Sequence, residues 1–370
     1  MIEILKRFNR YRNNKFKELK NIFRTVKLNR QKKVKSLFDL DKCHSILIVM
    51  CDYGIGDAIV TSFLIYELRK NNYNVSVVAD DRLSFLFDHF IEVDNAFFFN
   101  KKNIKKFIRS IKKIKIDLAI DLYDEGNNSL RRVEIISSFK PAHTLGFNQP
   151  KYKQYDTSIS YSGYDAHITE RSCMVLNFLS IDYDITKYYL NVQDTELQVA
   201  KKFVEKICNG LNKFIIVFNP FGSTKTKSFS LQQIEKITEF LAQQKNCITI
   251  VVGEQKEIAS IYELPNVYIN KNPSFIVTSA LVSLSNLVIT VDTSIVHVAS
   301  AYNIPMVAVY NNRYNLCFDL NKVWAPISNN FELIFTNENR GTELGDPVSN
   351  LDTQFIIEKI SKILSVNLEY

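Results

Sequence analysis

Short apolar segments alternate with longer helical segments from Ser45 almost to the end of the chain, and this rhythm restricts the fold more than any other feature. Segments such as Ser45–Met50, Phe214–Phe218 and Leu287–Val291 have the length and apolar content of buried strands. Segments of about 10 to 15 residues with helical patterns separate them, which is typical of parallel sheets with helices on both faces. We therefore predict the α/β fold class.

The strands fall into two series, each of the usual size of a domain. We predict two doubly wound Rossmann-like domains, residues 41–193 and residues 194–345. Residues 1–40 form a basic amphipathic segment in front of them. Residues 346–370 contain a last helix, Asp352–Leu364, which could reach back across the N-terminal domain.

The composition fits a soluble protein with a sizeable core, since 46% of the residues are hydrophobic and 23% are charged. No apolar run reaches the roughly 18 to 20 residues of a membrane span, and the basic N-terminus lacks the apolar segment of a signal peptide. The six cysteines show no paired spacing, which argues for reduced thiols and against a disulfide framework or a zinc site. We therefore expect a cytoplasmic protein.

Positive charge is concentrated in residues 1–35, which hold thirteen Lys and Arg against two Glu, whereas the whole chain has a net charge of +8. Apolar residues recur there mostly at steps of three and four, at Leu5, Phe8, Phe16, Leu19, Ile22, Phe23 and Val26. Such a basic amphipathic helix suits an anionic membrane surface, where each Lys or Arg contributes about 1 kcal/mol. Two alternatives stay open: a helix that packs on the protein's own body, and binding of RNA or DNA.

The turn Gly54-Ile55-Gly56-Asp57 follows the first strand and begins a helix. Its glycines match the start of a dinucleotide fingerprint, but Ile59 stands where the third glycine belongs, so a nicotinamide cofactor is disfavoured. Asp57 lies beyond the carboxyl end of a strand, where ligands of open parallel sheets bind, and is a candidate general base. A helix N-terminus would keep this carboxylate ionised but weaken it as a base, and the alternative role is helix capping.

Two further polar turns follow strands of the second series. Asn219–Lys227 combines hydroxyl side chains with two lysines, which suits a polyanion, although its spacing is not that of a Walker A loop. Gly253–Glu257 places a carboxylate where it could bind ribose hydroxyl groups. In both turns the alternative is an ordinary solvated surface loop.

The segment Leu287–Tyr310 has the pattern of a strand, a polar turn, a helix and a second strand. Asp292-Thr293-Ser294 at the helix start offers hydroxyl and backbone N–H groups to a phosphate or diphosphate. His297 lies three residues beyond Ser294 and would share a face with that site. Alone, these residues are also consistent with a helix cap and a structural histidine. Several such turns at the carboxyl ends of strands in both domains favour a ligand-binding cleft.

These motifs resemble glycosyltransferase family 9, the ADP-heptose–lipopolysaccharide heptosyltransferases, from about Ser45 to the C-terminus. The matching segments are the GIGD turn, Ile120-Asp121-Leu122, His167–Arg171, the NPFGSTKTKSF turn and VDTSIVHVASAYNIPMVAVY. The resemblance implies the GT-B architecture, in which two Rossmann-like domains face a central cleft, with the acceptor in the N-terminal domain and the nucleotide sugar in the C-terminal one. It also implies sugar transfer with inversion, without a metal or another cofactor.

The resemblance makes Asp57 the catalytic base and places His297 beside the donor phosphate. Lys227 is followed by Ser-Phe-Ser, where many members have Trp-Pro, and Ser294 replaces the usual glycine, so the identity of the sugar donor and acceptor stays open. The implied acceptor contacts are Gly56, Asp121 and Arg171. The implied donor contacts are Ser223, Thr224, Lys227, Glu257, Asp292, Thr293, Ser294 and His297.

The function we expect is transfer of a heptose from ADP-heptose to a lipid-linked lipopolysaccharide or lipooligosaccharide core acceptor on the cytoplasmic face of the inner membrane. Residues 1–35 would hold the enzyme on the anionic bilayer, and no nucleic-acid partner is expected. The alternatives are transfer from another nucleotide sugar into a surface polysaccharide, a nucleotide-binding dehydrogenase or epimerase, and a non-catalytic envelope or nucleic-acid binding protein.

Overall fold

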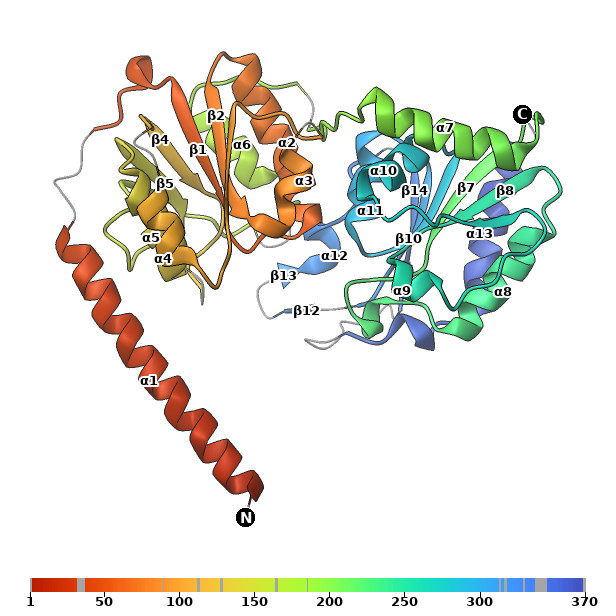
Figure 1. The fold of residues 1–370 in the computed structure, drawn as a ribbon, viewed down its shortest axis with the longest axis horizontal. Helices are drawn as coiled ribbons and strands as arrows, with labels where there is room; N and C mark the ends of the chain where they lie inside the picture. The colour runs from red at the N-terminus through yellow and green to blue at the C-terminus, as the bar shows by residue number, and fades with distance from the viewer. Residues whose placement is uncertain are drawn as a thin grey trace.

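The computed structural model describes residues 2–31, 37–88, 90–111, 114–126, 129–163, 166–184, 186–312, 314–315, 318–328, 330–336 and 345–368. Two six-stranded parallel sheets form its core, one in each half of the chain (Figure 1). Their strands lie within the residue ranges predicted for the two domains, and the predicted α/β fold class is confirmed.

The first sheet has the strand order β3-β2-β1-β4-β5-β6. Its strands are β1 (Ser45–Met50), β2 (Asn74–Asp80), β3 (Asn95–Phe99), β4 (Leu118–Asp121), β5 (His143–Phe147) and β6 (Thr157–Ile159). The helices of this half are α2 (Ile55–Lys70), α3 (Ser84–Phe87), α4 (Ile104–Ser110), α5 (Ser129–Phe139) and α6 (Glu170–Phe178), with 3-10 turns η1 (Leu40–Lys42) and η2 (Asp81–Leu83). Alternate residues of β1 enter different apolar clusters, Ile46 and Ile48 that of α2 and α6, and Leu47 and Val49 that of α5. The sheet is therefore covered on both faces.

The second sheet has the order β14-β11-β10-β7-β8-β9. Its strands are β7 (Phe214–Asn219), β8 (Cys247–Val251), β9 (Val267–Ile269), β10 (Leu287–Val291), β11 (Met306–Tyr310) and β14 (Phe331–Phe335), and β12 (Tyr314–Asn315) pairs with β13 (Phe318–Asp319) apart from it. The helices are α7 (Asp194–Cys208), α8 (Leu231–Ala242), α9 (Gln255–Ile258), α10 (Phe275–Ser283), α11 (Ser294–Ala301), α12 (Leu320–Val323) and α13 (Thr353–Leu368), with 3-10 turns η3 (Lys225–Lys227) and η4 (Val348–Asn350). In both sheets the connections reverse direction beside the first strand, β1 or β7, where open sheets form a crevice at the carboxyl ends.

The strands that the sequence pattern did not reveal, β3, β6 and β14, lie at edges of the two sheets. Most of their residues are only partly buried or exposed. β6 and β14 lack the continuous apolar run of the central strands, whereas β3 has such a run at Ala96–Phe99 that the pattern left unassigned.

The last helix differs from its prediction. Ile356, Ile360 and Leu364 lie on one face of α13 and are buried in the apolar core of the C-terminal half, where α13 packs against α8. The prediction that this helix reaches back across the N-terminal domain is therefore wrong. The two halves instead meet directly where α2 packs against α11.

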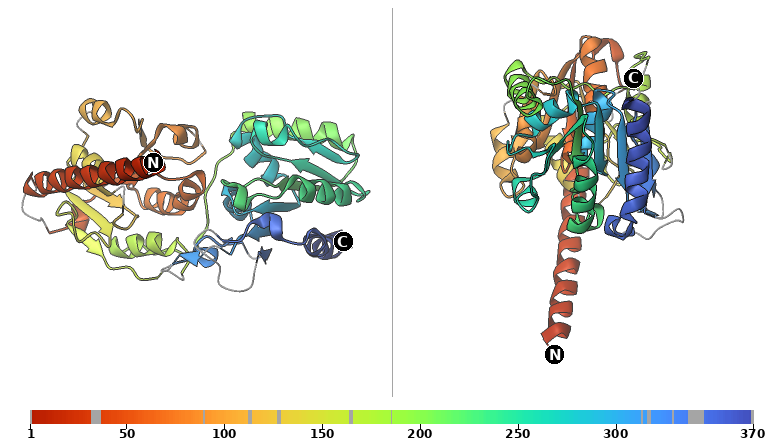
Figure 2. Two further views of the ribbon diagram at one scale, coloured as in Figure 1. Left: turned by 90° about the horizontal axis from the view of Figure 1, so that it is seen from below. Right: turned by 90° about the vertical axis from the view of Figure 1, so that its right-hand side faces the viewer.

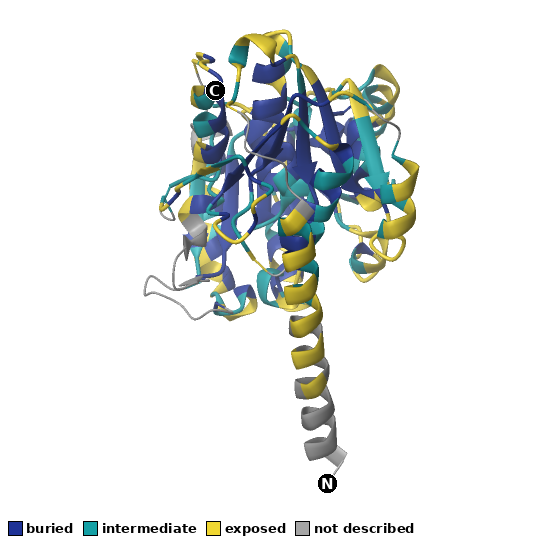
Figure 3. Cartoon of the chain, turned by 90° about the vertical axis from the view of Figure 1, so that its left-hand side faces the viewer, coloured by how far each residue is buried: buried dark blue, intermediate teal, exposed yellow. Residues whose placement is uncertain are grey.

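Helix α1 (Ile2–Gln31) extends from the N-terminal half as a rod (Figures 1 and 2). The last third of α1 touches the body: Arg24 Nε donates to Glu134 Oε1 of α5 at 2.9 Å, and Leu28 packs on the apolar cluster of α5. Phe16 and Phe23 are 66% and 75% exposed, and Figure 3 shows exposed residues along the described part of the helix in yellow. Among the described side chains of α1, the alternative of a helix packed on the body thus holds for the C-terminal end. Among the described helices, none combines the length and apolarity that crossing a bilayer requires.

Candidate active site

A cavity of about 740 Å³ lies between the two halves, at the carboxyl ends of β1, β7, β8 and β10. Its lining joins the turn that begins α2 to the turns that follow β7, β8 and β10. The predicted site residues that it brings together are Gly56, Asp57, Ser223, Lys227, Glu257, Asp292, Thr293, Ser294 and His297. Polar turns from distant parts of the sequence therefore share one cavity, as the positions of the strand ends predict.

Asp57 lies at the third position of α2, and its side chain is held at both oxygens. Oδ2 accepts a hydrogen bond from the Gly54 N–H at 2.6 Å, which completes a capping arrangement at the helix start. Oδ1 accepts from the Tyr123 hydroxyl at 2.9 Å. Burial raises the pKa of Asp57, and these two hydrogen bonds oppose the rise. Burial thus outweighs the lowering of the Asp57 pKa that we expected from the helix start. Asp57 also caps the helix, and this role does not exclude that of a base.

The donor side is built around the start of α11. Thr293 caps this helix, since its Oγ1 accepts from the Ile295 N–H at 3.3 Å, and Asn219 Nδ2 donates to the same oxygen at 3.0 Å. Lys227 Nζ forms an ion pair with the Asp292 carboxylate. The lysine from the turn after β7 and the polar turn after β10 therefore already meet, and an anionic ligand here would compete with Asp292 for Lys227.

His297 is 4% exposed, and burial lowers its pKa to about 3. Its ring packs edge-on against Tyr188 and Trp324, with centroid distances of 5.7 and 6.0 Å. A Cβ placed on Gly56 would come within 3.0 Å of His297 Cδ2, so the glycine permits the close approach of α2 and α11. The imidazole is therefore neutral near pH 7 and could orient a phosphate only as a hydrogen-bond donor, while its packing joins the two halves.

Three predicted contacts lie outside the cavity lining. Asp121 is fully buried, and its Oδ2 accepts hydrogen bonds from Arg132 Nε at 2.7 Å and from the Tyr155 hydroxyl at 2.6 Å. Arg171 is also buried, with its guanidinium bound to the Leu122 carbonyl and the Asp124 carboxylate, both internal partners. Neither side chain can reach an acceptor in this arrangement, so their prediction as acceptor contacts is corrected to an internal supporting role.

The predicted donor residue Thr224 is exposed and is not among the residues that line the cavity. It precedes the 3-10 turn η3, its carbonyl accepts from the Lys227 N–H at 3.0 Å, and its Oγ1 lies 2.9 Å from Thr226 Oγ1. The turn carries Lys227 to the cavity and leaves Thr224 outside it. As a direct donor contact, Thr224 is therefore not supported by the geometry.

Several lining residues were missed from the sequence. Arg82 from η2 and Lys256 from α9 add positive charge, and Trp324 adds an aromatic wall. The position of Arg82 just beyond β2 was a usable signal, because the same rule singled out the turns after β1, β7 and β10. Tyr123, which holds Asp57, follows β4 in the same way.

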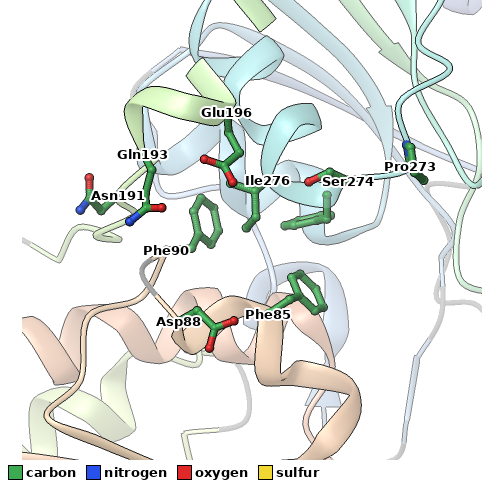
Figure 4. Close-up of a pocket in the computed structure, with 10 residues that line it drawn as sticks. Phe85, Asp88, Phe90, Asn191, Gln193, Glu196, Pro273, Ser274 and Ile276 are labelled. Atoms are coloured by element: carbon green, nitrogen blue, oxygen red, sulfur yellow. The ribbon is translucent and has the colours of Figure 1, made fainter. Parts of the chain in front are cut away.

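A second cavity of about 540 Å³ lies near the connection between the halves (Figure 4). Phe275 at the start of α10 makes edge-on ring contacts there with Phe85 and Phe90, at centroid distances of 6.0 and 6.3 Å. None of the predicted site residues line it. Within the described part of the chain, no cluster of three or more His, Cys, Asp or Glu side chains could hold a metal ion.

Comparison with known proteins shows which protein family the chain resembles. The model of glycosyltransferase family 9 (heptosyltransferase) matches residues 104–350. The curated protein "Putative lipopolysaccharide heptosyltransferase 4" of Escherichia coli K12 is 26% identical over 364 residues, covering 92% of this chain and 93% of that protein.

Solved structures show the same architecture. A family 9 glycosyltransferase of Veillonella parvula DSM 2008 has a TM-score of 0.69 at 17% identity and covers 88% of this chain and 98% of its own. The E. coli ADP-heptose lipopolysaccharide heptosyltransferase II has a TM-score of 0.67 at 17% identity, covering 88% and 100%. An E. coli heptosyltransferase with ADP has a TM-score of 0.62 at 14% identity, covering 86% and 99%. The predicted GT-B fold is thereby confirmed.

Proposed function

The chain belongs to glycosyltransferase family 9, and on that premise we propose that it transfers a heptose from ADP-heptose to a lipid-linked lipopolysaccharide core acceptor. One observation carries this proposal. The partly buried carboxylate of Asp57 lines the same cavity as Lys227 and the start of α11, which are suited to a diphosphate. A base and an anion site on opposite halves are what transfer from a nucleotide sugar to a hydroxyl group requires.

In the proposed reaction the acceptor hydroxyl attacks the anomeric carbon of the heptose, and Asp57 takes the hydroxyl proton. The new C–O bond forms as the bond from the anomeric carbon to the diphosphate oxygen breaks, with inversion and release of ADP. Raising the pKa of Asp57 by burial brings it closer to neutrality, which strengthens it as a base. Arg82 supplies positive charge to the cavity in which negative charge develops on the leaving group, and Lys227 does so when the diphosphate displaces Asp292. Lys256 is paired with Glu254 of the same lining at 2.7 Å.

The test is a transfer assay with purified protein and a core-truncated lipopolysaccharide acceptor, comparing ADP-heptose with UDP- and GDP-sugars. We expect ADP release and heptose incorporation from ADP-heptose, and loss of transfer with unchanged ADP binding in Asp57→Asn. Transfer from a UDP- or GDP-sugar alone would refute the heptose donor and leave a glycosyltransferase of different specificity. Full turnover by Asp57→Asn would remove this residue from the role of base.

We also propose that α1 holds the enzyme on an anionic membrane, at the cytoplasmic face of the inner membrane. Phe16, Leu19, Phe23 and Val26 recur at steps of three and four and are exposed on one face of the helix. The residues that dock on the body, Arg24 and Leu28 among them, lie on a different face. Docking of α1 thus leaves an apolar face free between basic side chains, the arrangement that anionic bilayers bind.

Sedimentation with vesicles tests this placement. The full chain is expected to bind phosphatidylglycerol-containing vesicles more strongly than pure phosphatidylcholine vesicles, and less strongly in high salt. The double variant Phe16→Ser/Phe23→Ser is expected to bind at least about tenfold more weakly, because each buried Phe contributes about 1.5 to 3 kcal/mol. Tyr262→Ser, which removes an 82% exposed aromatic ring from the C-terminal half, is the matched control. Equal binding by all three, or salt-sensitive binding of RNA without vesicle binding, would refute the membrane role.

A further inference from the structure

We propose that Tyr123 is a positioning residue that holds the Asp57 carboxylate in the orientation from which it removes the acceptor proton. This inference rests on the proposed function, because it takes Asp57 as the base. It concerns a side chain in the loop between β4 and α5, which lies outside every motif that the sequence singled out.

The hydrogen bonds to Asp57 fix the orientation of its carboxylate. The Tyr123 hydroxyl donates to Oδ1 at 2.9 Å, and the Gly54 N–H donates to Oδ2 at 2.6 Å. A carboxylate oxygen can accept more than one hydrogen bond, so each oxygen keeps capacity for an acceptor hydroxyl. Two donors on different oxygens prevent rotation about the Cβ–Cγ bond, which a single donor would allow. Without Tyr123, Oδ1 would lose this donor, whereas Gly54 would still hold Oδ2.

Tyr123 is itself fixed on several sides. Its N–H donates to Asp121 Oδ1 at 3.1 Å, and its carbonyl accepts from Gln149 Nε2 at 2.7 Å. Its ring stands edge-on to Tyr53 at a centroid distance of 4.8 Å, and the Arg132 guanidinium lies 5.5 Å from the ring centroid. Asp121, predicted as an acceptor contact, thus acts behind the site by fixing the backbone of the residue that holds the base.

The charged and titratable groups around Asp57 determine the sign of the effect. Arg82 from η2 lowers the pKa of Asp57, as do the hydrogen bonds from Gly54 and Tyr123, whereas burial raises it. From α11, the neutral His297 adds no charge near pH 7. Burial and the nearby Asp57 charge raise the pKa of Tyr123, which keeps its hydroxyl protonated and able to donate. Removal of this hydroxyl takes a hydrogen bond from the ionised form of Asp57 and must raise its pKa further.

The pH dependence of kcat tests the proposal in Tyr123→Phe. Because the base must be ionised, kcat of the wild type falls as the pH is lowered through the pKa of Asp57. In Tyr123→Phe the midpoint of that fall is expected to move up by about one pH unit, with the KM for the donor unchanged within about twofold. Tyr155→Phe is the matched control, because it removes another tyrosine–carboxylate hydrogen bond of the same half, the buried one of 2.6 Å to Asp121. An unchanged midpoint in Tyr123→Phe, or an equal shift in Tyr155→Phe, would overturn the proposal.

A second readout does not depend on transfer. Titration of the aspartate carboxyl carbons by NMR, with Asp57→Asn identifying the signal, should show the same upward shift in Tyr123→Phe. If the shift occurs but the wild-type enzyme transfers no sugar, the proposed function fails and the positioning role stands. Gln149→Met, which loosens the Tyr123 backbone and keeps its hydroxyl, serves if Tyr123→Phe does not fold. It should shift the titration in the same direction by a smaller amount, and no shift would count against the proposal.

Discussion

Replacement of Gly56 by alanine would strain the contact that joins the two halves of the enzyme. A Cβ at this position would come within 3.0 Å of His297 Cδ2 and within 3.5 Å of Nε2, so the neighbour must give way by a few tenths of an ångström. The imidazole has little room to move, because it is buried against Tyr188 and Trp324. We therefore expect Gly56→Ala to separate the start of α2 from α11.

Two opposing effects set the change in the free energy of unfolding. An extra methyl group in a well-packed contact costs about 1 to 3 kcal/mol. Alanine in place of glycine in a helix contributes up to about 1 kcal/mol of stabilisation. The net expectation is a loss of about 1 to 2 kcal/mol, seen as a fall in Tm of a few degrees. Activity should fall by about tenfold, because Asp57 is the next residue along α2 and a displacement of about 1 Å in a catalytic group can cost a hundredfold.

Thermal unfolding and kcat are measured for Gly56→Ala beside Gly126→Ala, whose added Cβ would have no heavy atom within 4 Å. The control is expected to match the wild type in kcat. The double variant Gly56→Ala/His297→Ala isolates the contact, since the cost of the added methyl should largely disappear once the imidazole is gone. An equal cost with and without the imidazole, or a Tm above that of the wild type, would refute this reasoning.

Three further predictions concern charge. Lys227→Gln should raise the KM for the nucleotide sugar about tenfold or more in initial-rate assays, because it removes a charged hydrogen bond to the diphosphate, and an unchanged KM would place the diphosphate elsewhere. Arg132→Met should lower the urea-unfolding free energy by about 3 to 5 kcal/mol, because Asp121 would stay buried without its partner, and a loss below about 1 kcal/mol would contradict that pairing. Burial lowers the pKa of His167 to about 4 and of His297 to about 3. Below about pH 6.5 the unfolded state therefore binds more protons than the folded state, and each histidine should lower the free energy of unfolding by about 2 kcal/mol by pH 5. In the double variant His167→Gln/His297→Gln the free energy of unfolding should fall less steeply as the pH is lowered, and a pH dependence equal to that of the wild type would contradict this prediction.

The fold was predictable from the central strands, because positions that are buried on both faces of a sheet are occupied almost entirely by apolar residues. Nearly every residue of β1, β10 and β11 is buried, so these strands are continuous apolar runs. The edge strands β6 and β14 are mostly half-exposed or exposed and show no such run. The path of α13 could not be read from its sequence, since an amphipathic helix has an apolar face but carries no signal for the surface that it covers.

The grouping of the predicted donor residues at one cavity was predictable because it is local. Lys227, Asp292 and Thr293 come from turns that directly follow β7 and β10, which are neighbours in the sheet. The acceptor side depends on contacts between distant residues. Asp121 ends β4 and so satisfied the same rule, but its charge is taken up by Arg132 from α5, a pairing without a local signal. The position after a strand therefore identifies the edge of the sheet on which a ligand binds, and the side-chain partners decide which residues can touch it.

The turn from Gly54 to Asp57 joins three functions that the sequence suggested only separately. Gly54 donates to the carboxylate of Asp57, Gly56 lets α2 approach His297 and Ser294 of α11, and Asp57 faces the shared cavity. Since these residues occupy a single helical turn, a shift of α11 relative to α2 changes the distance between Asp57 and the start of α11. The predicted ligand contacts at Ser294 and the adjacent Thr293 are therefore linked to Asp57 through one packed contact between the halves. The glycine at position 56 thus sets how closely the start of α2 approaches α11, and this role adds to the acceptor contact predicted for it.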